Sequence, residues 1–494
     1  MNRARNLLVL SALAAFLLIL LLRSKPSLPS NQTAKKPLIV YCAAGIKPPV
    51  EAAARLYEQT YGVAIQIQYG GSGTLLSNLR IAGKGDLFLA ADDTYLQLAQ
   101  TNHLLDEIVP LARMTPVIAV RQGNPKQIQG LDDLFRVDVA LANPDAAAIG
   151  KTTRELLRKM DRWTALENRV RVFKPTVNDV ANDIKLGTVD AGIIWDATAR
   201  QYPELELVAV PAFASGEQTV AIGILKFSEQ PTAALHFARY LGARDRGLKE
   251  FARCGYRPVE GDVWAEKPSL VLFSGGVNRI AIEETIRRFE EREGAQVTRV
   301  YNGCGILVSQ MKSGQRPDAY FACDLSFMRD VADLFWDATT VSETDMVLLV
   351  PKSNPKSIHR LADLAQPGLR LGVANAEQSA LGALTARLLK TQGLHDQVMA
   401  NVKVQTPTAD MLVNQMRTGS LDAVVVYEAN TSQVRELFTV LPISEPGAKA
   451  VQPYAIGRNS QHRLLMERLL SALRSAGSRQ RFESAGFHWR AAGD

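Results

Sequence analysis

The residues of this sequence best suited to chemistry are small and polar, and they lie in turns where an apolar run gives way to a helical pattern. The turn 69–73 (YGGSG) follows one apolar run, and the segment 143–150 precedes another helical stretch. Glycine lets a ligand approach the backbone closely, and the free N–H groups at a helix start favour an anion. Ser72 adds a hydroxyl donor, although a serine in this position could instead cap the helix. These turns predict a site for a small anion.

Two patterns in the same segments resemble enzyme motifs but lack essential residues. The segment 149–152 (IGKT) looks like the end of a phosphate-binding loop, but Asp145 stands where that motif needs a glycine. Ser72 lies among glycines as a hydrolase nucleophile does, but Thr74 stands where the motif needs its second glycine. No histidine and acid follow in a suitable order. We therefore expect a binding protein rather than an enzyme, with no cofactor.

The composition indicates a folded, mildly basic chain. The 494 residues are 47% hydrophobic and 22% charged, with a formal net charge of +7. Basic residues form no run of the kind that binds nucleic acid. The 6 His form no HExxH motif, and the 4 Cys form no CxxC motif. These observations argue against a nucleic-acid partner, a zinc site and a small disulfide-dense fold.

The N-terminal segment differs from the rest of the chain. A basic start is followed by an apolar run from Leu7 to Leu22 and then by a polar, proline-broken stretch that ends at Lys36. The apolar run is long for a signal-peptide core and slightly short for a full membrane span. We interpret residues 1–36 as an N-terminal signal-anchor helix with its linker, and a cleaved export signal is the alternative. Either interpretation places the remaining residues outside the cytoplasm.

The elements that must position the turns occur twice. Segments of the first half recur in the second half at a spacing of 232 residues, and the pairs are 38–41 with 270–273, 69–75 with 301–307, and 86–92 with 318–324. A period of this length is far too long for a solenoid of short repeats. The repetition predicts two copies of one domain, at residues 37–262 and 268–494.

Each copy alternates short apolar runs with longer amphipathic stretches, which predicts an α/β fold with largely parallel sheets. The strands predicted in the first copy are 38–42, 64–69, 86–90, 115–120, 137–141, 191–195 and 219–225. The helices predicted there are 48–61, 74–83, 93–100, 150–159, 178–186 and 231–243. The pattern leaves open whether a copy has one sheet or two smaller sheets with a cleft between them.

Four strings of the first copy carry a family resemblance, namely LIVYCAAG, YGGSGTL, GDLFLAAD and VDAGIIW. They resemble the periplasmic molybdate-binding proteins of ABC importers, which are type II periplasmic binding proteins, and the second copy resembles them more loosely. The resemblance implies a tandem duplication of a two-lobed fold, in which each pair of lobes closes on a ligand. It also implies a tetrahedral oxyanion ligand, molybdate or tungstate, an ABC permease as partner, and a location on the periplasmic side of the cytoplasmic membrane.

The resemblance further implies the ligand-binding residues. In the first copy the family's donors fall on Gly45, Ser72, Ile149, Val177 and Trp195, with Asp196 beside them. In the second copy they fall on Cys304, Leu381, Ala409 and Tyr427, with Val277 at the remaining serine position. The second copy has therefore lost both serine hydroxyls, and we expect it to bind a different ligand or none. An extracytoplasmic sensor or interaction module with repurposed clefts, or a binder of another anion or of a metal ion, remains the alternative function.

Overall fold

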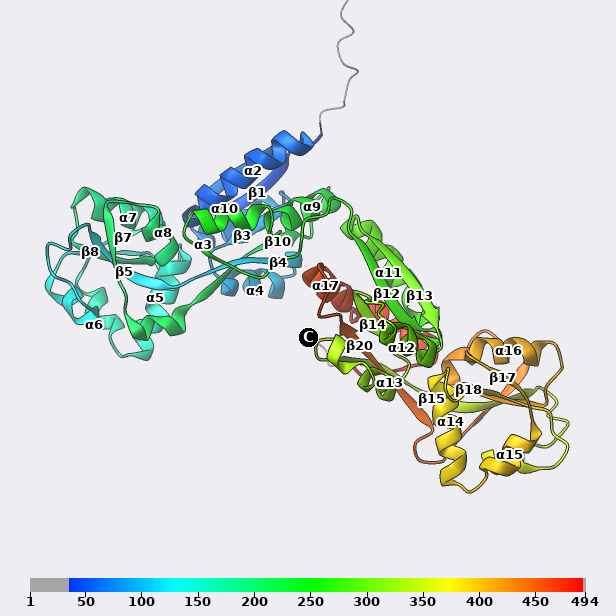
Figure 1. Cartoon of the computed structure of the whole chain (residues 1–494). Coiled ribbons are helices and arrows are strands. Elements are labelled where there is room, and N and C mark those ends of the chain that lie inside the picture. Colours follow the sequence, from blue (N-terminus) through cyan, green and yellow to red (C-terminus); the bar gives the residue numbers. More distant parts are fainter. Residues whose placement is uncertain (1–34, 492–494) are drawn as a thin grey trace, which may run out of the picture.

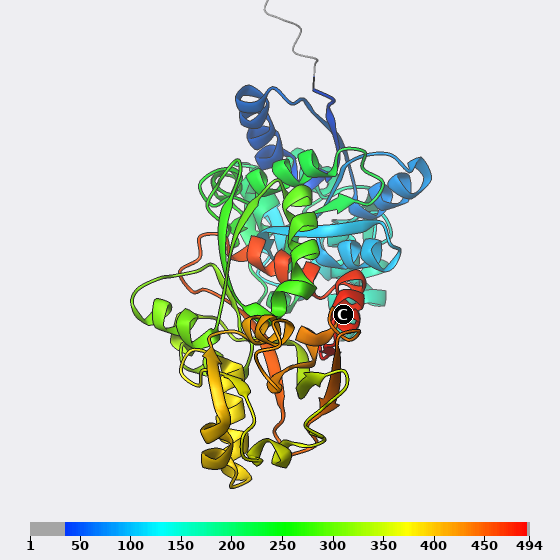
Figure 2. The same ribbon diagram turned by 90° about the vertical axis from the view of Figure 1, so that its right-hand side faces the viewer.

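The computed structural model describes residues 35–491, which form four lobes in a row (Figure 1). The elements β1 to β11 form an N-terminal unit, and β12 to β21 form a C-terminal unit. Each unit has an inner lobe, next to the other unit, and an outer lobe at the end of the row. The view turned by 90° (Figure 2) shows the yellow and orange outer lobe of the C-terminal unit pointing away from the blue and cyan N-terminal elements.

The inner lobe of the N-terminal unit is built on a six-stranded sheet in the order β11-β4-β10-β3-β1-β2. Its strands are β1 (Leu38–Ala43), β2 (Ile65–Gly70), β3 (Leu87–Ala90), β4 (Leu105–Met114), β10 (Gln218–Leu225) and β11 (Arg257–Pro258). Its helices are η1 (Ala44–Ile46), α2 (Lys47–Tyr61), α3 (Ser72–Ala82), α4 (Asp93–Thr101), α9 (Pro231–Leu241) and α10 (Gly247–Arg253). Strand β3 is buried along its whole length, as its unbroken apolar sequence predicts.

The outer lobe of this unit has a five-stranded sheet in the order β7-β6-β8-β5-β9. Its strands are β5 (Pro116–Arg121), β6 (Val139–Ala142), β7 (Val170–Lys174), β8 (Ala191–Trp195) and β9 (Leu205–Val208). Its helices are η2 (Leu131–Arg136), α5 (Ala148–Lys159), α6 (Trp163–Glu167), α7 (Val177–Leu186), α8 (Asp196–Arg200) and η3 (Pro211–Gly216). The chain enters this lobe between β4 and β5 and returns to the inner lobe through β10, so that two segments connect the lobes.

The C-terminal unit repeats this plan. Its strands are β12 (Ser269–Gly275), β13 (Gln296–Asn302), β14 (Ala319–Phe321), β15 (Thr339–Pro351), β16 (Leu371–Ala374), β17 (Val402–Thr406), β18 (Ala423–Tyr427), β19 (Phe438–Pro442), β20 (Lys449–Ile456) and β21 (His488–Trp489). Its helices are η4 (Gly276–Asn278), α11 (Arg279–Glu293), α12 (Cys304–Lys312), α13 (Leu325–Arg329), η5 (Ala332–Leu334), η6 (Leu361–Ala365), α14 (Ala380–Thr391), α15 (His395–Asn401), α16 (Ala409–Arg417), η7 (Glu428–Thr431), α17 (Arg463–Leu473) and α18 (Ala476–Ser484).

The two units differ in the strand that joins their lobes. In the C-terminal unit β15 is unbroken, and it pairs with β20 in the inner lobe and with β18 and β19 in the outer lobe. In the N-terminal unit the same path is divided into β4 and β5. Met346 pairs with Tyr427 as Pro116 pairs with Trp195, and the Met346 N–H donates to the Ala448 carbonyl at 2.8 Å. Because proline has no N–H, the N-terminal unit cannot make this bond, and its strand is interrupted there.

Charged side chains join the two inner lobes. Arg292, at the end of α11, forms two hydrogen bonds of 2.8 Å with Glu107 of the N-terminal unit. The buried Glu293 accepts two hydrogen bonds from Arg468, at 2.6 and 3.1 Å, and lies 3.8 Å from Arg239 of the N-terminal unit. A buried carboxylate needs such partners in place of water. Arg468 belongs to the same unit as Glu293, so the contacts that link the two inner lobes are those of Arg292 with Glu107 and of Glu293 with Arg239.

The segment between the units adds a helix cap to this junction. The Asp262 carboxylate accepts the N–H groups of Leu464 and Leu465, in the first turn of α17, at 2.9 and 3.0 Å. A carboxylate at this position satisfies N–H groups that have no partner inside the helix. Burial raises the pKa of Asp262, and the bonds from Leu464 and Leu465 oppose that shift.

The structure confirms the α/β fold and the internal duplication, and each copy has two lobes as the resemblance implies. The expectation of largely parallel sheets was wrong, because β10 pairs antiparallel with β3 and β4, and β5 pairs antiparallel with β8 and β9. The segments that cross between lobes run back against the parallel strands of each sheet. Strands β4, β7, β9 and β11 were not predicted, since β4 mixes polar and apolar residues without a strict alternation and the other three are short and mostly not buried.

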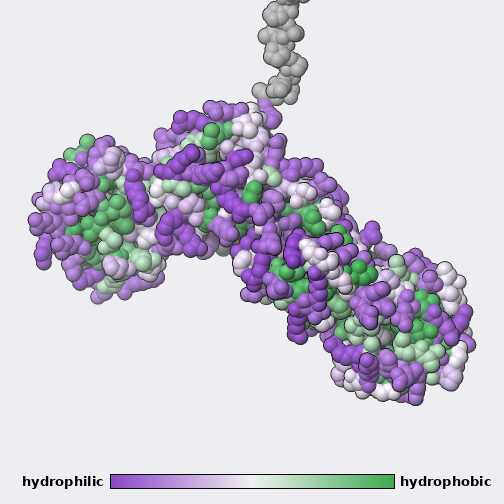
Figure 3. All heavy atoms as spheres, viewed as in Figure 1, coloured by the Kyte–Doolittle hydropathy of each residue, from purple (hydrophilic) through white to green (hydrophobic). Residues whose placement is uncertain are grey.

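Within residues 35–491, no helix has the length and apolar character needed to cross a membrane. The predicted signal anchor at residues 7–22 lies outside the described residues. The face shown in Figure 3 is mostly hydrophilic, and its hydrophobic residues lie in separate patches over both units.

Candidate functional site

A small cavity lies between the two lobes of the N-terminal unit. Its volume is about 20 Å³, which is room for about one water molecule. Its walls are turns that follow strands and the starts of helices, and the lining residues are Ala43, Ala44, Gly45, Gly70, Gly71, Ser72, Ala91, Ala147, Ala148, Ile149, Thr176, Val177 and Trp195. None of these side chains carries a charge, so any recognition in this cavity depends on neutral donors and on shape.

Three helices begin at the wall of this cavity. Helix α3 starts at Ser72 in the inner lobe, while α5 starts at Ala148 and α7 at Val177 in the outer lobe. The first N–H groups of a helix have no partner within the helix, and the helix dipole places partial positive charge at the same end. Helix starts from both lobes therefore converge on one point, an arrangement that favours an anion between the lobes.

Ser72 supplies a hydroxyl group to the same wall. The residue is 1% exposed, and its Oγ accepts the Ala91 N–H at 3.1 Å. A hydroxyl oxygen that accepts a backbone bond still has its own proton to donate. Gly71, not Ser72, is the N-cap residue of α3, and no side chain caps this helix. Ser72 is therefore not the cap of this helix. The hydrogen bond from the Ala91 N–H holds the Ser72 hydroxyl in position.

The two lobes touch each other beside the cavity. The Gly73 and Thr74 N–H groups of α3 donate to the Ala146 carbonyl of the outer lobe, at 3.0 and 3.4 Å. A Cβ atom added to Gly73 would lie 2.5 Å from the Asp145 carbonyl oxygen, and one added to Gly71 would lie 2.9 Å from the Pro175 carbonyl oxygen. The N-terminal unit is therefore closed, and its contact surface tolerates only glycine at these two positions.

Gly45 and Trp195 bound the remaining side of the cavity. Trp195 ends β8 and is 1% exposed. A Cβ atom on Gly45 would lie 2.7 Å from Val177 Cγ1, so a serine here would displace that side chain. Thr198 Oγ1 lies 3.4 Å from the same point, and it is a buried oxygen without a hydrogen-bond partner in the described part of the chain. The sequence analysis did not single out this hydroxyl.

Asp196 lies outside the set of lining residues. Its Oδ1 accepts the Thr115 N–H at 2.9 Å, and its Oδ2 pairs with Arg200 Nη1 at 3.0 Å. The carboxylate thus binds Thr115, which lies between β4 and β5 where the lobes connect. Because it is turned to this segment, the lining of the cavity contains no charged residue.

The structure brings together five of the six residues predicted for this unit, namely Gly45, Ser72, Ile149, Val177 and Trp195. Lining residues that the sequence analysis missed include Ala91 and Thr176, whereas Ala147 lies in the segment 143–150 that it named. The available signal was their place in the chain, because each follows a strand or precedes a helix. The methyl side chain of Ala91 gave no chemical reason to choose it, and the Thr176 hydroxyl caps α7 by accepting the Asp179 N–H.

At the equivalent position of the C-terminal unit, sulfur replaces the serine oxygen. Cys304 begins α12 as Ser72 begins α3, and its Sγ accepts the Cys323 N–H at 3.1 Å. The residues predicted for this unit, Cys304, Leu381, Ala409 and Tyr427, are all buried. The Tyr427 hydroxyl has no hydrogen-bond partner among residues 35–491, and burial raises its pKa well above the usual range.

The lobes of the C-terminal unit make the same kind of contact. The Gly305 N–H donates to the Gln378 carbonyl at 3.0 Å, as Gly73 does to Ala146. Carbonyl oxygens of Gln378 and Pro407 also crowd the position of a Cβ on Gly303. Both units are therefore closed through one helix start and one opposing loop.

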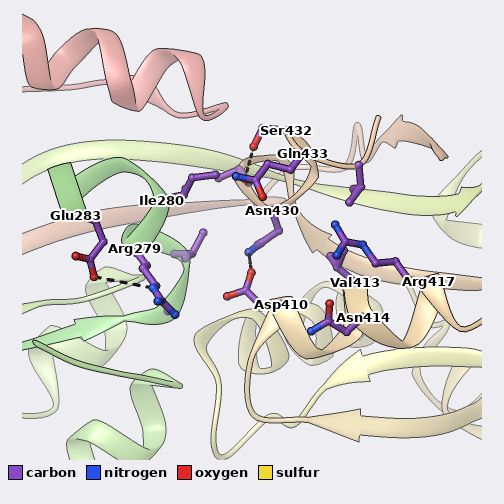
Figure 4. Close-up of a pocket in the computed structure, with 14 residues that line it drawn as sticks. Arg279, Ile280, Glu283, Asp410, Val413, Asn414, Arg417, Asn430, Ser432 and Gln433 are labelled. Atoms are coloured by element: carbon purple, nitrogen blue, oxygen red, sulfur yellow. Dashed lines mark hydrogen bonds and ion pairs between the residues drawn. The ribbon is translucent and has the colours of Figure 1, made fainter. Parts of the chain in front are cut away.

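A larger pocket opens beside the cleft of the C-terminal unit (Figure 4). Its volume is about 450 Å³, and its wall comes from η4 and α11 of the inner lobe and from α16 and η7 of the outer lobe. Arg279 pairs with Glu283 at 3.9 Å, and Asn430 donates to Asp410 at 2.8 Å. Burial raises the pKa of Asp410. This pocket is polar and carries both signs of charge, unlike the cavity of the N-terminal unit.

One side chain in the wall of this pocket differs between the copies. At the repeat spacing of 232 residues, Val434 of this pocket stands where the N-terminal unit has Tyr202. There the Tyr202 hydroxyl accepts a hydrogen bond from Asn178 at 3.4 Å. Val277 lines the pocket, whereas Cys304, Leu381, Ala409 and Tyr427 lie outside its lining.

The sequence matches the family described as bacterial extracellular solute-binding protein twice, over residues 38–257 and 270–488. The chain belongs to this family. It carries two tandem copies of the family's domain, which confirms the resemblance to type II periplasmic binding proteins. The family consists of binding proteins, so the expectation that the chain is not an enzyme is also confirmed.

Individual relatives match one copy at a time. A Haemophilus influenzae protein, named provisionally as a binding protein, is 28% identical over 226 residues, which cover 45% of this chain and 91% of the relative. The molybdate-binding protein ModA of Mycobacterium tuberculosis is 26% identical over 225 residues, 44% of this chain and 84% of the relative. The solved periplasmic molybdate-binding protein of Azotobacter vinelandii is 15% identical, with a TM-score of 0.39, over 44% of this chain and 98% of that one.

We predict that Gly73→Ala opens the N-terminal unit. The added methyl group would overlap the Asp145 carbonyl oxygen and break the Gly73 to Ala146 hydrogen bond between the lobes. Hydrogen–deuterium exchange in segments 71–75 and 143–150 should become faster, because these amides gain access to water.

Gly130→Ala is the matched control for this substitution. A Cβ atom there meets nothing within 4 Å, and Gly130 has an extended backbone with φ −170°. This variant should exchange like the unmodified protein. Unchanged exchange in Gly73→Ala would show that the glycine contact does not hold the lobes together.

Proposed function

We propose that the N-terminal unit binds a tetrahedral oxyanion between its lobes, with molybdate or tungstate as the first candidates, for delivery to an ABC permease. The observation that carries this proposal is the uncharged cavity at which three helix starts and the Ser72 hydroxyl converge. Several oriented N–H and O–H donors can replace the water around an oxyanion without a counter-charge. The relative ModA of Mycobacterium tuberculosis is a molybdate-binding protein by name, which supports molybdate.

Binding requires the lobes to move. A cavity of about 20 Å³ holds about one water molecule, so a four-oxygen anion enters only when the Gly73 to Ala146 contact opens. The lobes then close again at a slightly larger separation, around the ligand. An anion can drive this closure only through its greater affinity for the closed form.

The C-terminal unit supports a second candidate function, that of an extracytoplasmic sensor or interaction module with a repurposed cleft. Cys304 replaces the serine, and the polar pocket of about 450 Å³ lies beside the original site. Arg279 and Arg417 in its wall suit an organic anion better than a metal oxyanion, because their guanidinium groups bind carboxylates in a planar, paired geometry.

The location and the domain limits complete the proposal. We propose that residues 1–36 anchor the chain at the periplasmic side of the cytoplasmic membrane through the apolar run 7–22, or act as a cleaved export signal. The domain limits that we propose are 37–262 and 268–494. The family description of an extracellular protein supports export.

In a thermal-shift panel of the full chain with molybdate, tungstate, sulfate, phosphate and ferric ion, we expect the first two ligands to raise the melting temperature. Ser72→Ala should weaken their binding about 10- to 100-fold, roughly 1.4–2.8 kcal/mol, because a donor to a charged ligand is lost. Isothermal titration calorimetry measures this change.

Ser77→Ala, on the exposed side of α3, is the control and should bind like the unmodified protein. Equal affinity of Ser72→Ala and the unmodified protein would remove the serine from the site. No shift with any oxyanion would refute the proposed ligand class.

We expect a fragment of residues 37–262 to fold by itself and to bind the same oxyanion as the full chain. Its two sheets and their connecting segments are complete within this range, and Asp262 caps a helix of the other unit without being part of the N-terminal sheets. Circular dichroism and calorimetry on the fragment test this. An aggregated product would mean that the two units share a core.

Removal of residues 1–36 should release the protein from the membrane fraction. The apolar run 7–22 is the segment in the sequence that we propose as the membrane contact. Fractionation of cells that express the full and the shortened chain, detected through a C-terminal tag, measures the distribution. A shortened chain that stays with the membrane would contradict the anchor.

A further inference from the structure

Two cysteine side chains meet at the base of the cleft in the C-terminal unit. Cys304 begins α12, and Cys323 directly follows β14. Their Sγ atoms are 2.7 Å apart, and the residues are 0% and 6% exposed. Two sulfur atoms that are not bonded pack at a larger separation than this. The backbone therefore already holds the pair within reach of a bond.

A second change between the copies makes room for the second sulfur. At the repeat spacing of 232 residues, Cys323 stands where the N-terminal unit has Ala91, and Gly275 stands where it has Ala43. A Cβ atom on Gly275 would overlap Cys323 Sγ. Ala43 and Ala91 of the first copy thus correspond to Gly275 and Cys323 of the second. Because Gly275 has no methyl group, the Cys323 sulfur fits in that space.

The surroundings favour a reactive thiolate on Cys304. Burial raises the pKa of this thiol, but the side-chain and backbone hydrogen bonds with Cys323 oppose burial, and the pKa lies below its ordinary value. Cys304 also begins α12, and a helix N-terminus stabilises a thiolate. The pKa of Cys323 is raised well above its usual range, first by the hydrogen bond with Cys304 and then by burial. One partner is therefore the nucleophile and the other keeps its proton.

We propose that Cys304 and Cys323 form a reversible disulfide, which makes the cleft of the C-terminal unit a redox-modified site. This inference rests on the proposed location outside the cytoplasm, where disulfides form and persist. The bond would tie the start of α12 to the end of β14. It would also remove the thiols from the position at which the N-terminal unit presents the Ser72 hydroxyl.

The oxidant is a small disulfide such as oxidised glutathione. The Cys304 thiolate attacks one of its sulfur atoms, forms a mixed disulfide and releases one glutathione thiolate. Cys323 then gives up its proton and attacks the Cys304 sulfur, which releases the second glutathione. Two electrons pass from the cysteine pair to the glutathione disulfide, and each released thiolate takes up a proton according to the pH. Separation of the lobes at the Gly305 to Gln378 contact gives the oxidant access to the pair.

Peptide mapping of the full chain tests this proposal. The protein is incubated with oxidised glutathione, denatured, alkylated and digested with trypsin. We expect peptides 300–312 and 313–329 to be linked, and Cys42 and Cys254 to be alkylated. Alkylation of all four cysteines would overturn the proposal, as would a link between another pair. A native mass that includes a bound metal ion, with thiols that react only after chelation, would also overturn it.

Two serine variants serve as matched controls. Cys304→Ser keeps an acceptor for the Cys323 N–H, and we expect it to abolish the linked peptide and leave Cys323 alkylated. Cys254→Ser should leave the link intact. Reduction should lower the melting temperature of the unmodified protein by several degrees and that of Cys304→Ser not at all, because only the former loses a cross-link.

The result of the disulfide test does not depend on whether the N-terminal unit binds an oxyanion. Titration of the same oxidised and reduced samples with molybdate reports on the N-terminal unit, since Cys304 and Cys323 lie in the other unit. A missing disulfide with normal molybdate binding refutes only this inference. A mapped disulfide without any oxyanion binding refutes only the proposed ligand.

Discussion

In both units the lobes meet where the first turn of a helix lies against a backbone carbonyl of the opposing lobe. Gly73 donates to Ala146 in one unit, and Gly305 donates to Gln378 in the other. The carbonyl lies so close that a side chain at the glycine would hold the lobes apart. This backbone contact therefore sets the separation of the lobes in the closed form that the structure shows. It also determines the size of the space that remains beside Ser72 and Cys304.

The chemistry of each cleft follows from what stands next to that contact. Around Ser72 the lining side chains are uncharged, so backbone groups, the hydroxyls of Ser72 and Thr176 and the Trp195 indole are the polar groups available at the wall. Around Cys304 two buried thiols occupy the same place, and each is the hydrogen-bond partner of the other. The same backbone thus presents hard oxygen donors in one copy and soft sulfur atoms in the other.

Much of the fold could be predicted because the repeated segments and the helix starts are visible in the order of residues alone. Matching segments at one spacing identified two copies, and the turn at Ser72 lies at the predicted start of a helix. Contacts between lobes could not be predicted in this way, because apolar periodicity reports burial and not the partner. The strand pairing of β4 with β10 and the bond from Thr115 to Asp196 join residues far apart in the chain.

The candidate site shows the same limit. Resemblance placed Gly45, Ser72, Ile149, Val177 and Trp195, and the structure gathers them around one cavity. It could not tell that Asp196 turns toward the connection between β4 and β5. The pairing of Cys304 with Cys323 was within reach of the sequence, because Cys323 aligns with Ala91 beside Ser72. The sequence does not show that Ala91 and Ser72 are in contact, because their hydrogen bond is a feature of the structure. Without that contact, the alignment of the two copies gives no reason to pair Cys323 with Cys304.

The ion pairs of Glu107, Arg292 and Glu293 make the two inner lobes one body. Each outer lobe is joined to this body by segments of its own unit, so one cleft can open while the other stays closed. Because the outer lobes stand at the two ends of the row, opening either cleft changes the span of the molecule (Figure 1). A partner that contacted both outer lobes would respond to the state of both clefts through one distance, the separation of those lobes.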